Sequence, residues 1–133
     1  MQRFKQDNIE WLEFDLLADI PHLKHAVFLR HGGQSQAPFN SLNISFEVGD
    51  NAAAVEHNRA LIAKHSKGNS FNWSHMVTGQ GCHGKHVSYV ERQSPHTIPQ
   101  CDGLISSTPG ITLMMTHADC QIALFYDPHH RVS

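Results

Sequence analysis

The sequence predicts an α+β fold. Three features favour this class: one amphipathic helical stretch, four or five short runs with the character of β-strands, and too little helical sequence for alternating βαβ units. The chain has 133 residues, which is enough for one small domain and too few for two of ordinary size. Apolar residues make up 40% of the chain, so it can bury a core.

The helix is expected from Ala52 to about His65. It follows the turn sequence "VGDN", in which Asp50 or Asn51 can serve as the N-cap, and Gly68 is a natural end. Residues that recur with the helical period share one face of a helix. The apolar residues that fall roughly on one face are Val55, Leu61 and Ile62.

Four runs are expected to form strands. "HAVFLR", residues 25–30, stops before a pair of glycines, and "KHVSYVE", residues 85–91, alternates as a half-buried strand does. "ITLMMTH", residues 111–117, and "QIALFYD", residues 121–127, are apolar at most positions. Such runs are typical of strands that are buried on both faces.

The charge pattern excludes some classes of partner. The net charge of −2 gives no electrostatic reason to expect binding to nucleic acid or to an anionic membrane. No apolar run approaches the ~20 residues that a membrane helix needs. The start, "MQRFKQDNIEWLEFDLL", is rich in acids and has no apolar signal segment, so a cytoplasmic location is expected.

Cysteine and histidine are the residues that draw attention. The three cysteines are an odd number, which in a reducing cytosol favours free thiols or metal ligands over a disulfide framework. The twelve histidines exceed the ten lysines and arginines. This count makes a metal site plausible without locating it.

Two short stretches concentrate these residues. "GCHGKH" contains Cys82, His83 and His86 beside Gly84, and "HADC" ends in Cys120. Thiolate and imidazole are the usual ligands of zinc, and ligands far apart in sequence are normal for a catalytic metal site. The same pair of groups also suits nucleophilic catalysis, in which a histidine draws the proton from the thiol. Sequence alone does not separate these two chemistries.

Each candidate residue also has an ordinary structural interpretation. A buried cysteine such as Cys120, Cys101 or Cys82 can be a small apolar residue, and His83 can be a loop histidine bonded to the backbone. Asp119 can be a turn or cap carboxylate, and His117 can simply be exposed. The last pair of histidines, His129 and His130, is expected on a solvated turn.

Seven segments occur in an order that resembles the YfiH family of laccase-domain, polyphenol-oxidase-like proteins. The resemblance covers essentially the whole chain, and the order of the segments is more specific than any one of them. The segments are "RHGGQS", "SLNI", "VGDN", "VEHNRALI", "CHGKHV", "DGLISSTPGITLMMTHADC" and "YDP".

The resemblance implies a fold of mixed β-sheets packed as a sandwich with outer helices. Members of the family are about twice this long, so residues 1–133 are expected to be the N-terminal part of a single domain. The family's zinc site takes a histidine from an "HG" motif, here His83, and a cysteine from "ADC", here Cys120. A second histidine, from "HAGWRG", would fall a few residues beyond Ser133.

The resemblance also implies a function: zinc-dependent phosphorolysis of adenosine, inosine, guanosine and methylthioadenosine, with adenosine deaminase activity. Purine nucleoside and phosphate would be the partners. His83 and Cys120 would be catalytic as metal ligands, and the open zinc position can activate water for attack on C6 of adenine. Arg30 has the fork geometry for phosphate or ribose, or for a structural ion pair. His117 and Asp119 are candidates to support the ligands.

Other functions stay open at this point. A copper-dependent phenol oxidase fits the family's earlier name, although one His/Cys/His site has few ligands for a multicopper cluster. A hydrolase that uses Cys and His is another. A non-catalytic remnant that binds a complementing chain, or an oligomer, through exposed strands is a third. The motif departs from the family at Gly81, where a glutamine is usual, with Gln80 one position earlier.

Two ligands bind zinc less tightly than three, so we expect the 133-residue chain to be inactive without complementation. The strands that would cover the two apolar runs are also expected to be missing. An exposed apolar patch is therefore predicted at Met114, Met115, Ile122 and Leu124.

Overall fold

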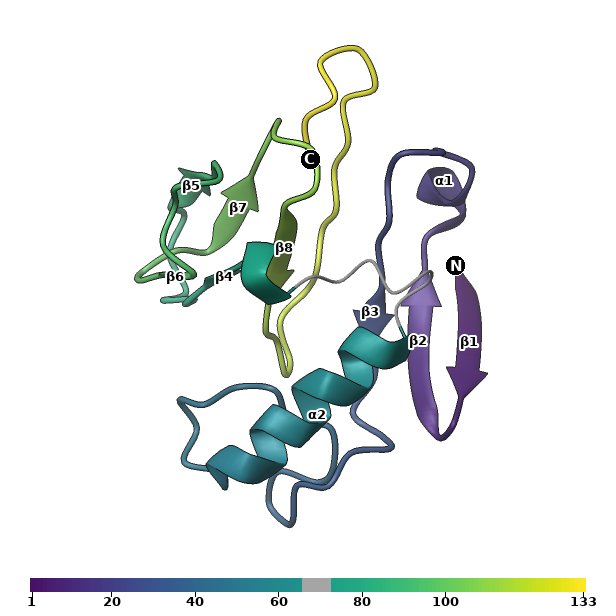
Figure 1. Cartoon of the computed structure of the whole chain (residues 1–133), viewed down its shortest axis with the longest axis vertical. Helices are drawn as coiled ribbons and strands as arrows, with labels where there is room; N and C mark the ends of the chain where they lie inside the picture. Colours follow the sequence, from purple (N-terminus) through teal and green to yellow (C-terminus); the bar gives the residue numbers. More distant parts are fainter. Residues whose placement is uncertain (66–72) are drawn as a thin grey trace. The chain divides into compact units, whose positions relative to one another are not determined.

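The structure is a computed structural model that describes residues 1–65 and 73–133. The chain divides into two compact units, Met1–Ser70 and Phe71–Ser133 (Figure 1). The first contains an antiparallel sheet and the longer helix, and the second contains two parallel sheets. The predicted α+β class is confirmed.

The first unit begins with a β-hairpin that the sequence-based prediction lacks. Strand β1 (Gln2–Gln6) pairs antiparallel with β2 (Ile9–Glu13), and β2 pairs with β3 (Val27–Phe28). Asp7 and Asn8 form the two-residue turn with φ of 47° and 69°. Positive φ at both positions is the requirement of a type I′ turn, which Asp and Asn tolerate. A four-residue helix, α1 (Asp15–Ala18), follows β2.

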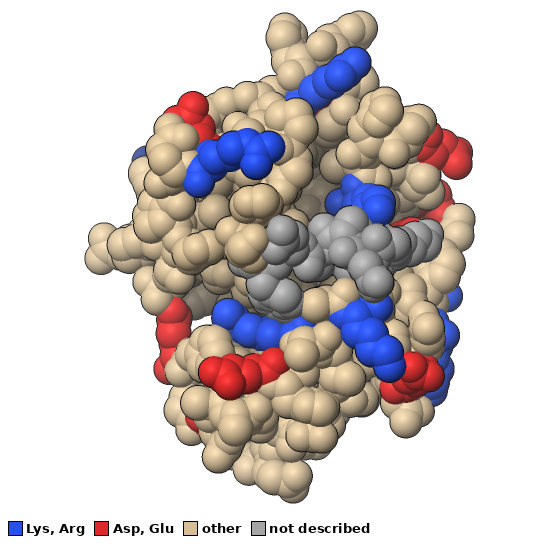
Figure 2. All heavy atoms as spheres, in the orientation of Figure 1, with Lys and Arg blue, Asp and Glu red and all other residues tan. Residues whose placement is uncertain are grey.

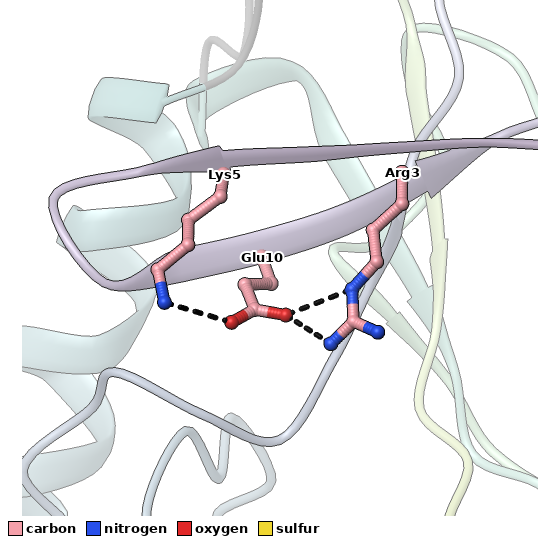
Figure 3. A network of polar contacts seen from close by, with 3 residues as sticks. All are labelled: Arg3, Lys5 and Glu10. Carbon is pink, nitrogen blue, oxygen red and sulfur yellow. Dashed lines mark hydrogen bonds and ion pairs between the residues drawn. The ribbon is translucent and has the colours of Figure 1, made fainter.

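The two faces of the hairpin carry different residues, because side chains alternate along a strand. On one face Phe4 lies opposite Trp11, and their rings stack with centroids 5.7 Å apart. On the other, Figure 3 shows Arg3 and Lys5 reaching the Glu10 carboxylate, with Lys5 Nζ 3.1 Å from Oε1. Hydrogen bonds from Arg3 and then Lys5 hold the pKa of Glu10 below its usual range.

The core of this unit lies on the Trp11 face of the hairpin. Four buried residues from the hairpin, the following loop and the long helix form its centre: Ile9, Trp11, Leu42 and Ile62. Five partly buried apolar residues pack against them: Phe4, Ala26, Phe28, Ile44 and Leu61. The strand predicted at residues 25–30 is present in shortened form, since only Val27–Phe28 pairs with β2.

Helix α2 (Ala52–His65) has the bounds that the sequence predicts. Asn51 is its N-cap, since Asn51 Oδ1 accepts a hydrogen bond from the Ala54 N–H at 3.1 Å. The predicted end at Gly68 lies outside the described residues. The side chains that the helix buries are Val55, Asn58, Ile62 and His65.

Asn58 is fully buried, and its side chain joins helix α2 to the loop that follows β3. Its Oδ1 accepts from the Gln34 N–H at 2.8 Å. Its Nδ2 donates to Ser35 Oγ at 2.9 Å, to Ser41 O at 3.1 Å and to Asn43 O at 2.7 Å. One buried amide thus satisfies polar groups across the irregular loop, as a buried backbone without a sheet partner requires.

The second unit is built around parallel strand pairs. After a short 3₁₀ helix, η2 (Trp73–His75), strand β4 (Met76–Gly79) lies between β6 (Thr97–Ile98) and β8 (Thr112–Met115). Strand β5 (Val87–Tyr89) pairs with β7 (Gly103–Ile105). The strands predicted at residues 85–91 and 111–117 are confirmed in shortened form.

The strand predicted at residues 121–127 is wrong. Within it only Asp127 makes a β-bridge, to Val132, and Phe125 is 81% exposed. Apolar composition indicated burial, but no sheet in the described part of the chain pairs with this segment. The apolar patch expected here is present in part: Met115 and Leu124 are exposed, while Met114 and Ile122 are half-buried.

In the described residues no helix is long and apolar enough to cross a membrane. On the face drawn in Figure 2, several acidic side chains lie next to basic ones, and uncharged surface separates these charged groups from one another. This mixture fits the small net charge of −2.

Replacing Asn58 with alanine should destabilise the first unit, because several buried loop groups would lose their partners at once. Unsatisfied buried polar groups each cost about 1–3 kcal/mol, so we expect Asn58→Ala to lower the free energy of unfolding by about 2–4 kcal/mol. Urea unfolding followed by circular dichroism measures this. Glu56→Ala, at an exposed position of the same helix, should change it by less than about 0.5 kcal/mol. Equal effects of the two substitutions would contradict the role given to Asn58.

Candidate metal-binding site

Two candidate loops leave the same edge of the central parallel sheet of the second unit. Strands β4 and β8 are parallel neighbours, and their last residues, Gly79 and Met115, are paired. Parallel strands end at a common edge of a sheet. His83 follows Gly79 by four residues and Cys120 follows Met115 by five. The topology thus starts both loops from one place.

Packing at this edge is tight. A Cβ atom on Gly79 would lie 2.5 Å from the sulfur of Met115 and 3.2 Å from the carbonyl oxygen of Cys101. Glycine lets the Met115 side chain lie directly over the end of β4. The paired ends of β4 and β8 are therefore held closely together, just before the two loops diverge.

The loop from Cys82 to His86 is fastened to Asp102 and its neighbour Gly103. The Asp102 carboxylate accepts from the Cys82 N–H at 2.9 Å and from the Cys82 thiol at 3.2 Å. At the other end of the loop, the backbone N–H groups of Asp102 and Gly103 donate to His86 O at 2.8 and 3.1 Å. Both ends of the segment that carries His83 are thus bound to one short stretch of chain.

The charge on Asp102 responds to these contacts. The Cys82 thiol, and then the N–H groups of Cys82, Gly84 and His86, hold the pKa of the Asp102 carboxyl below its usual range. The same hydrogen bond raises the pKa of the Cys82 thiol, because ionisation would place two negative charges together. Asp102 is therefore a carboxylate, and Cys82 a neutral thiol, at ordinary pH.

The loop bends at His83 and Gly84, and His83 has a φ of 59°. Gly84 has another role. A Cβ atom there would lie 3.1 Å from Asp102 Oδ2 and 3.4 Å from Cys82 Sγ, which is crowded. Gly84 allows the backbone to approach the carboxylate closely, and the His83 side chain is exposed.

The second loop is open to solvent. Residues 118–120 form a bend after β8, and His117, Asp119 and Cys120 are all exposed. Cys120 is therefore not the small buried residue that the structural interpretation offered. Across residues 1–65 and 73–133, no group of three or more His, Cys, Asp and Glu side chains is placed to hold a metal ion.

Arg30, the predicted substrate contact, belongs to the first unit. Its Nε and Nη2 donate to the carbonyl oxygen of Asn40 at 3.1 and 2.7 Å. The backbone carbonyl of Arg30 in turn accepts from the N–H groups of Ser41 and Leu42 at 3.0 and 2.9 Å. The Arg30 guanidinium thus contacts a backbone carbonyl. These bonds are not the ion pair that the structural interpretation expected.

The remaining cysteine and histidine candidates have structural roles. Cys101 is fully buried and its thiol donates to Gly103 O at 2.9 Å. His129 and His130 lie exposed on a turn, as predicted. Asp127 organises that turn, since its Oδ1 accepts from both backbone N–H groups at 2.8 and 3.3 Å and its Oδ2 lies 2.6 Å from His130 Nδ1.

Sequence reasoning missed Asp102. Cys82, the partner of its carboxylate, lies twenty positions earlier in the chain, so spacing gives no sign of the contact. The only local signal is that Asp102 opens the segment "DGLISSTPG" just before a strand. An aspartate followed by glycine there is also the usual composition of a turn.

Comparisons with known proteins place the chain among relatives. A family model described as "Multi-copper polyphenol oxidoreductase laccase" matches residues 24–133. A purine nucleoside phosphorylase of Mycobacterium tuberculosis is 34% identical over 107 residues, which cover 79% of this chain and 41% of the relative. A purine nucleoside phosphorylase of Pseudomonas aeruginosa is 35% identical over 117 residues, which cover 88% of this chain and 44% of the relative. The chain thus spans less than half the length of these relatives.

Solved structures agree on the fold. YlmD from Geobacillus stearothermophilus matches with a TM-score of 0.65 and 29% identity, covering 71% of this chain and 37% of that one. The hypothetical protein YfiH of Bacillus licheniformis matches with a TM-score of 0.78 and 22% identity, covering 96% of this chain and 48% of that one. At this low identity the second likeness supports the fold alone.

The turn at Asp127 gives a pH-dependent prediction. Its pKa lies at about 2, mainly because of the His130 side chain, so we expect His130→Ala to raise it towards the ordinary value of 3.8. A depressed pKa stabilises the folded turn above the unfolded pKa, and this contribution is lost as pH falls through the folded one. Carboxyl carbon shifts in an NMR titration measure the midpoint.

His129→Ala is the matched control for that titration, because His129 reaches Asp127 through its backbone N–H alone in the described contacts. Its midpoint should stay near that of the unaltered chain. A His130→Ala midpoint that does not move would show that the imidazole does not set the Asp127 pKa.

Proposed function

The chain belongs to the multi-copper polyphenol oxidoreductase laccase family, and from this premise we propose that it supplies part of the active site of a zinc-dependent purine nucleoside phosphorylase. The names of its relatives support this reading, since several are purine nucleoside phosphorylases. In the proposal, His83 and Cys120 are the catalytic residues of this chain, as two of the metal ligands.

The parallel pairing of β4 and β8 is the observation that carries the proposal. It starts the loops of His83 and Cys120 from one edge of one sheet, where ligands distant in sequence can converge. The donor set suits zinc, which takes both thiolate and imidazole, and both side chains are exposed. When bound, zinc supplies a Lewis acid and lowers the pKa of a coordinated water to about 7.

Other residues of the chain have supporting roles in the proposal. Arg30 contacts phosphate or ribose, for which its planar fork of five N–H donors is suited. Its bonds to Asn40 O fix the direction of that fork. His117 and Asp119 share the exposed loop of Cys120 and can orient it through hydrogen bonds.

We propose adenosine, inosine, guanosine and methylthioadenosine as the nucleosides, with phosphate as the second substrate. Adenosine deamination in the same site is part of the proposal. The residues of this chain would bind and orient the purine nucleoside, while removal of the amino group would need activated water at C6. The relatives' names support nucleoside phosphorolysis only.

A copper-dependent phenol oxidase is the second candidate, and the description of the family model favours it. Copper oxidation of phenols needs redox-active copper, which imidazole and thiolate also bind. Metal analysis separates the two candidates. Zinc in the purified protein with no phenol oxidation supports the phosphorylase, and copper with phenol oxidation supports the oxidase.

The exposed apolar segment suggests that further polypeptide completes the site. Met115, Leu124 and Phe125 are exposed at 37%, 41% and 81%, on either side of Cys120. Exposed apolar side chains that gather on one surface can mark a place where another segment packs. The relatives are more than twice as long as the matched region, so we propose that the covering segment corresponds to their remaining part.

Zinc binding tests the ligand assignment directly. We expect His83→Ala and Cys120→Ser each to weaken zinc binding by tenfold or more in a competition assay with a zinc indicator. A matched control is available: His129→Ala removes another exposed histidine, which lies outside both candidate loops. This control should bind zinc as the unaltered chain does. Unchanged affinity in both test variants would refute the assignment.

Activity of the purified 133-residue chain should be absent. With two proposed ligands and an uncovered apolar segment, it lacks a complete site. Incubation with inosine and phosphate, followed by chromatography for hypoxanthine, measures this. Turnover by the monomer, abolished by His83→Ala, would show that no further polypeptide is needed.

A further inference from the structure

We propose that Asp102 is a positioning residue, whose carboxylate holds the Cys82–His86 loop in the conformation that presents His83 to a metal ion. This inference rests on the proposed function, because it takes His83 to be a ligand. It assigns Asp102 no contact with substrate or metal.

The contacts surround the loop from both ends. Oδ1 of Asp102 accepts from the Cys82 N–H at 2.9 Å, immediately before His83. Oδ2 accepts from the Cys82 thiol at 3.2 Å. The Asp102 and Gly103 N–H groups donate to His86 O at 2.8 and 3.1 Å. These four hydrogen bonds hold both ends of the five-residue loop, and together they form the Asp102 clasp.

The strain in the loop lies at the residue that the clasp holds. His83 has a φ of 59°, in the left-handed region that costs a non-glycine residue free energy. Such a conformation persists only where its surroundings impose it. The bonds to Cys82 on one side and to His86 on the other impose it here, and with it the direction of the His83 Cα–Cβ bond.

A carboxylate suits this position better than an amide. Both of its oxygens accept, and both face donors: the Cys82 N–H at Oδ1 and the Cys82 thiol at Oδ2. Asparagine would place an NH₂ group against one of these donors. Gly84 leaves no side chain near Oδ2, where a Cβ would lie at 3.1 Å. Asp102→Asn therefore replaces one of the two side-chain acceptors with a donor while nearly preserving volume, and it leaves the backbone bonds to His86 O in place.

Strand pairing fixes where Asp102 itself lies. It precedes β7, which pairs with β5, and β5 begins at Val87, directly after the loop. Val87 and Gly103 are register partners. Asp102 thus lies directly before a paired strand, and the strand pairing gives it the rigid support that a positioning residue needs.

The test is a double-mutant cycle on zinc affinity, measured by competition with a zinc indicator in the full chain. Four proteins are compared: the unaltered chain, Asp102→Asn, His83→Ala and the double variant. Residues that orient a metal ligand typically change metal affinity by about 10- to 100-fold when altered. We expect Asp102→Asn to weaken zinc binding by about that factor in the unaltered background, and not at all in the His83→Ala background.

The cycle distinguishes positioning from a structural role. General loss of folding would weaken zinc binding through Cys120 in both backgrounds, whereas positioning acts only through His83. Asp127→Asn is the matched control, because Asp127 also accepts backbone N–H groups of a tight turn. It should leave the zinc affinity unchanged. If Asp102→Asn does not fold, Cys82→Ala removes the thiol contact alone and should give a smaller loss in the same direction.

The outcomes separate the inference from the function on which it rests. Unchanged affinity of Asp102→Asn, or equal weakening in both backgrounds, would overturn the inference and leave the zinc assignment intact. If His83→Ala binds zinc as tightly as the unaltered chain, the ligand assignment itself fails and the inference falls with it. A loss of affinity that occurs in the unaltered background and not in the His83→Ala background establishes Asp102 as the positioning residue.

Discussion

The buried amide of Asn58 is the interaction on which the first unit depends. The chain between β3 and α2 is irregular, and its backbone groups need partners that no sheet provides. Asn58 bonds to four of its residues from a position on the helix that periodicity alone would assign to an apolar side chain. Gly33 completes the arrangement, because a Cβ there would lie 2.5 Å from Asn58 Oδ1. Helix α2, the loop and the hairpin core therefore support one another. Arg30 is held in place through its bonds to Asn40 of the same loop.

The second unit solves a similar problem with a charged side chain. Asp102 gathers the loop after β4 as Asn58 gathers the loop after β3, but it does so near the surface. The difference suits the proposed roles. A buried amide fixes a scaffold, whereas a loop that is to hold a metal ligand must leave that ligand open to solvent, as His83 is. In each unit a polar side chain does for irregular backbone what strand pairing does elsewhere.

Sequence reasoning succeeds where local signals are strong and fails where the partner is distant. It predicts the start of α2 at Ala52 and its extent to about His65, because Asn51 is a good cap and the apolar spacing is helical. It misses the first hairpin, although Asp7-Asn8 is a suitable turn and Phe4 and Trp11 fall on one face. It places a strand at residues 121–127, since apolar composition indicates burial without naming the covering surface. His83 and Cys120 can be nominated from their chemistry, but their common sheet edge, and the role of Asp102, follow only from the pairing of distant strands.

The family description and the names of the relatives point to different chemistry, and the ligand set bears on the choice. The two ligands proposed for this chain, one imidazole and one thiolate, are a combination that single zinc sites use. A site completed by one further ligand from additional polypeptide would suit a single zinc ion, which needs three protein ligands and an open position. The exposed apolar residues on either side of Cys120 supply the reason for such polypeptide to pack there. In the proposed site, burial of Leu124 and Phe125 and completion of the metal site would then occur together, when the covering segment packs beside Cys120.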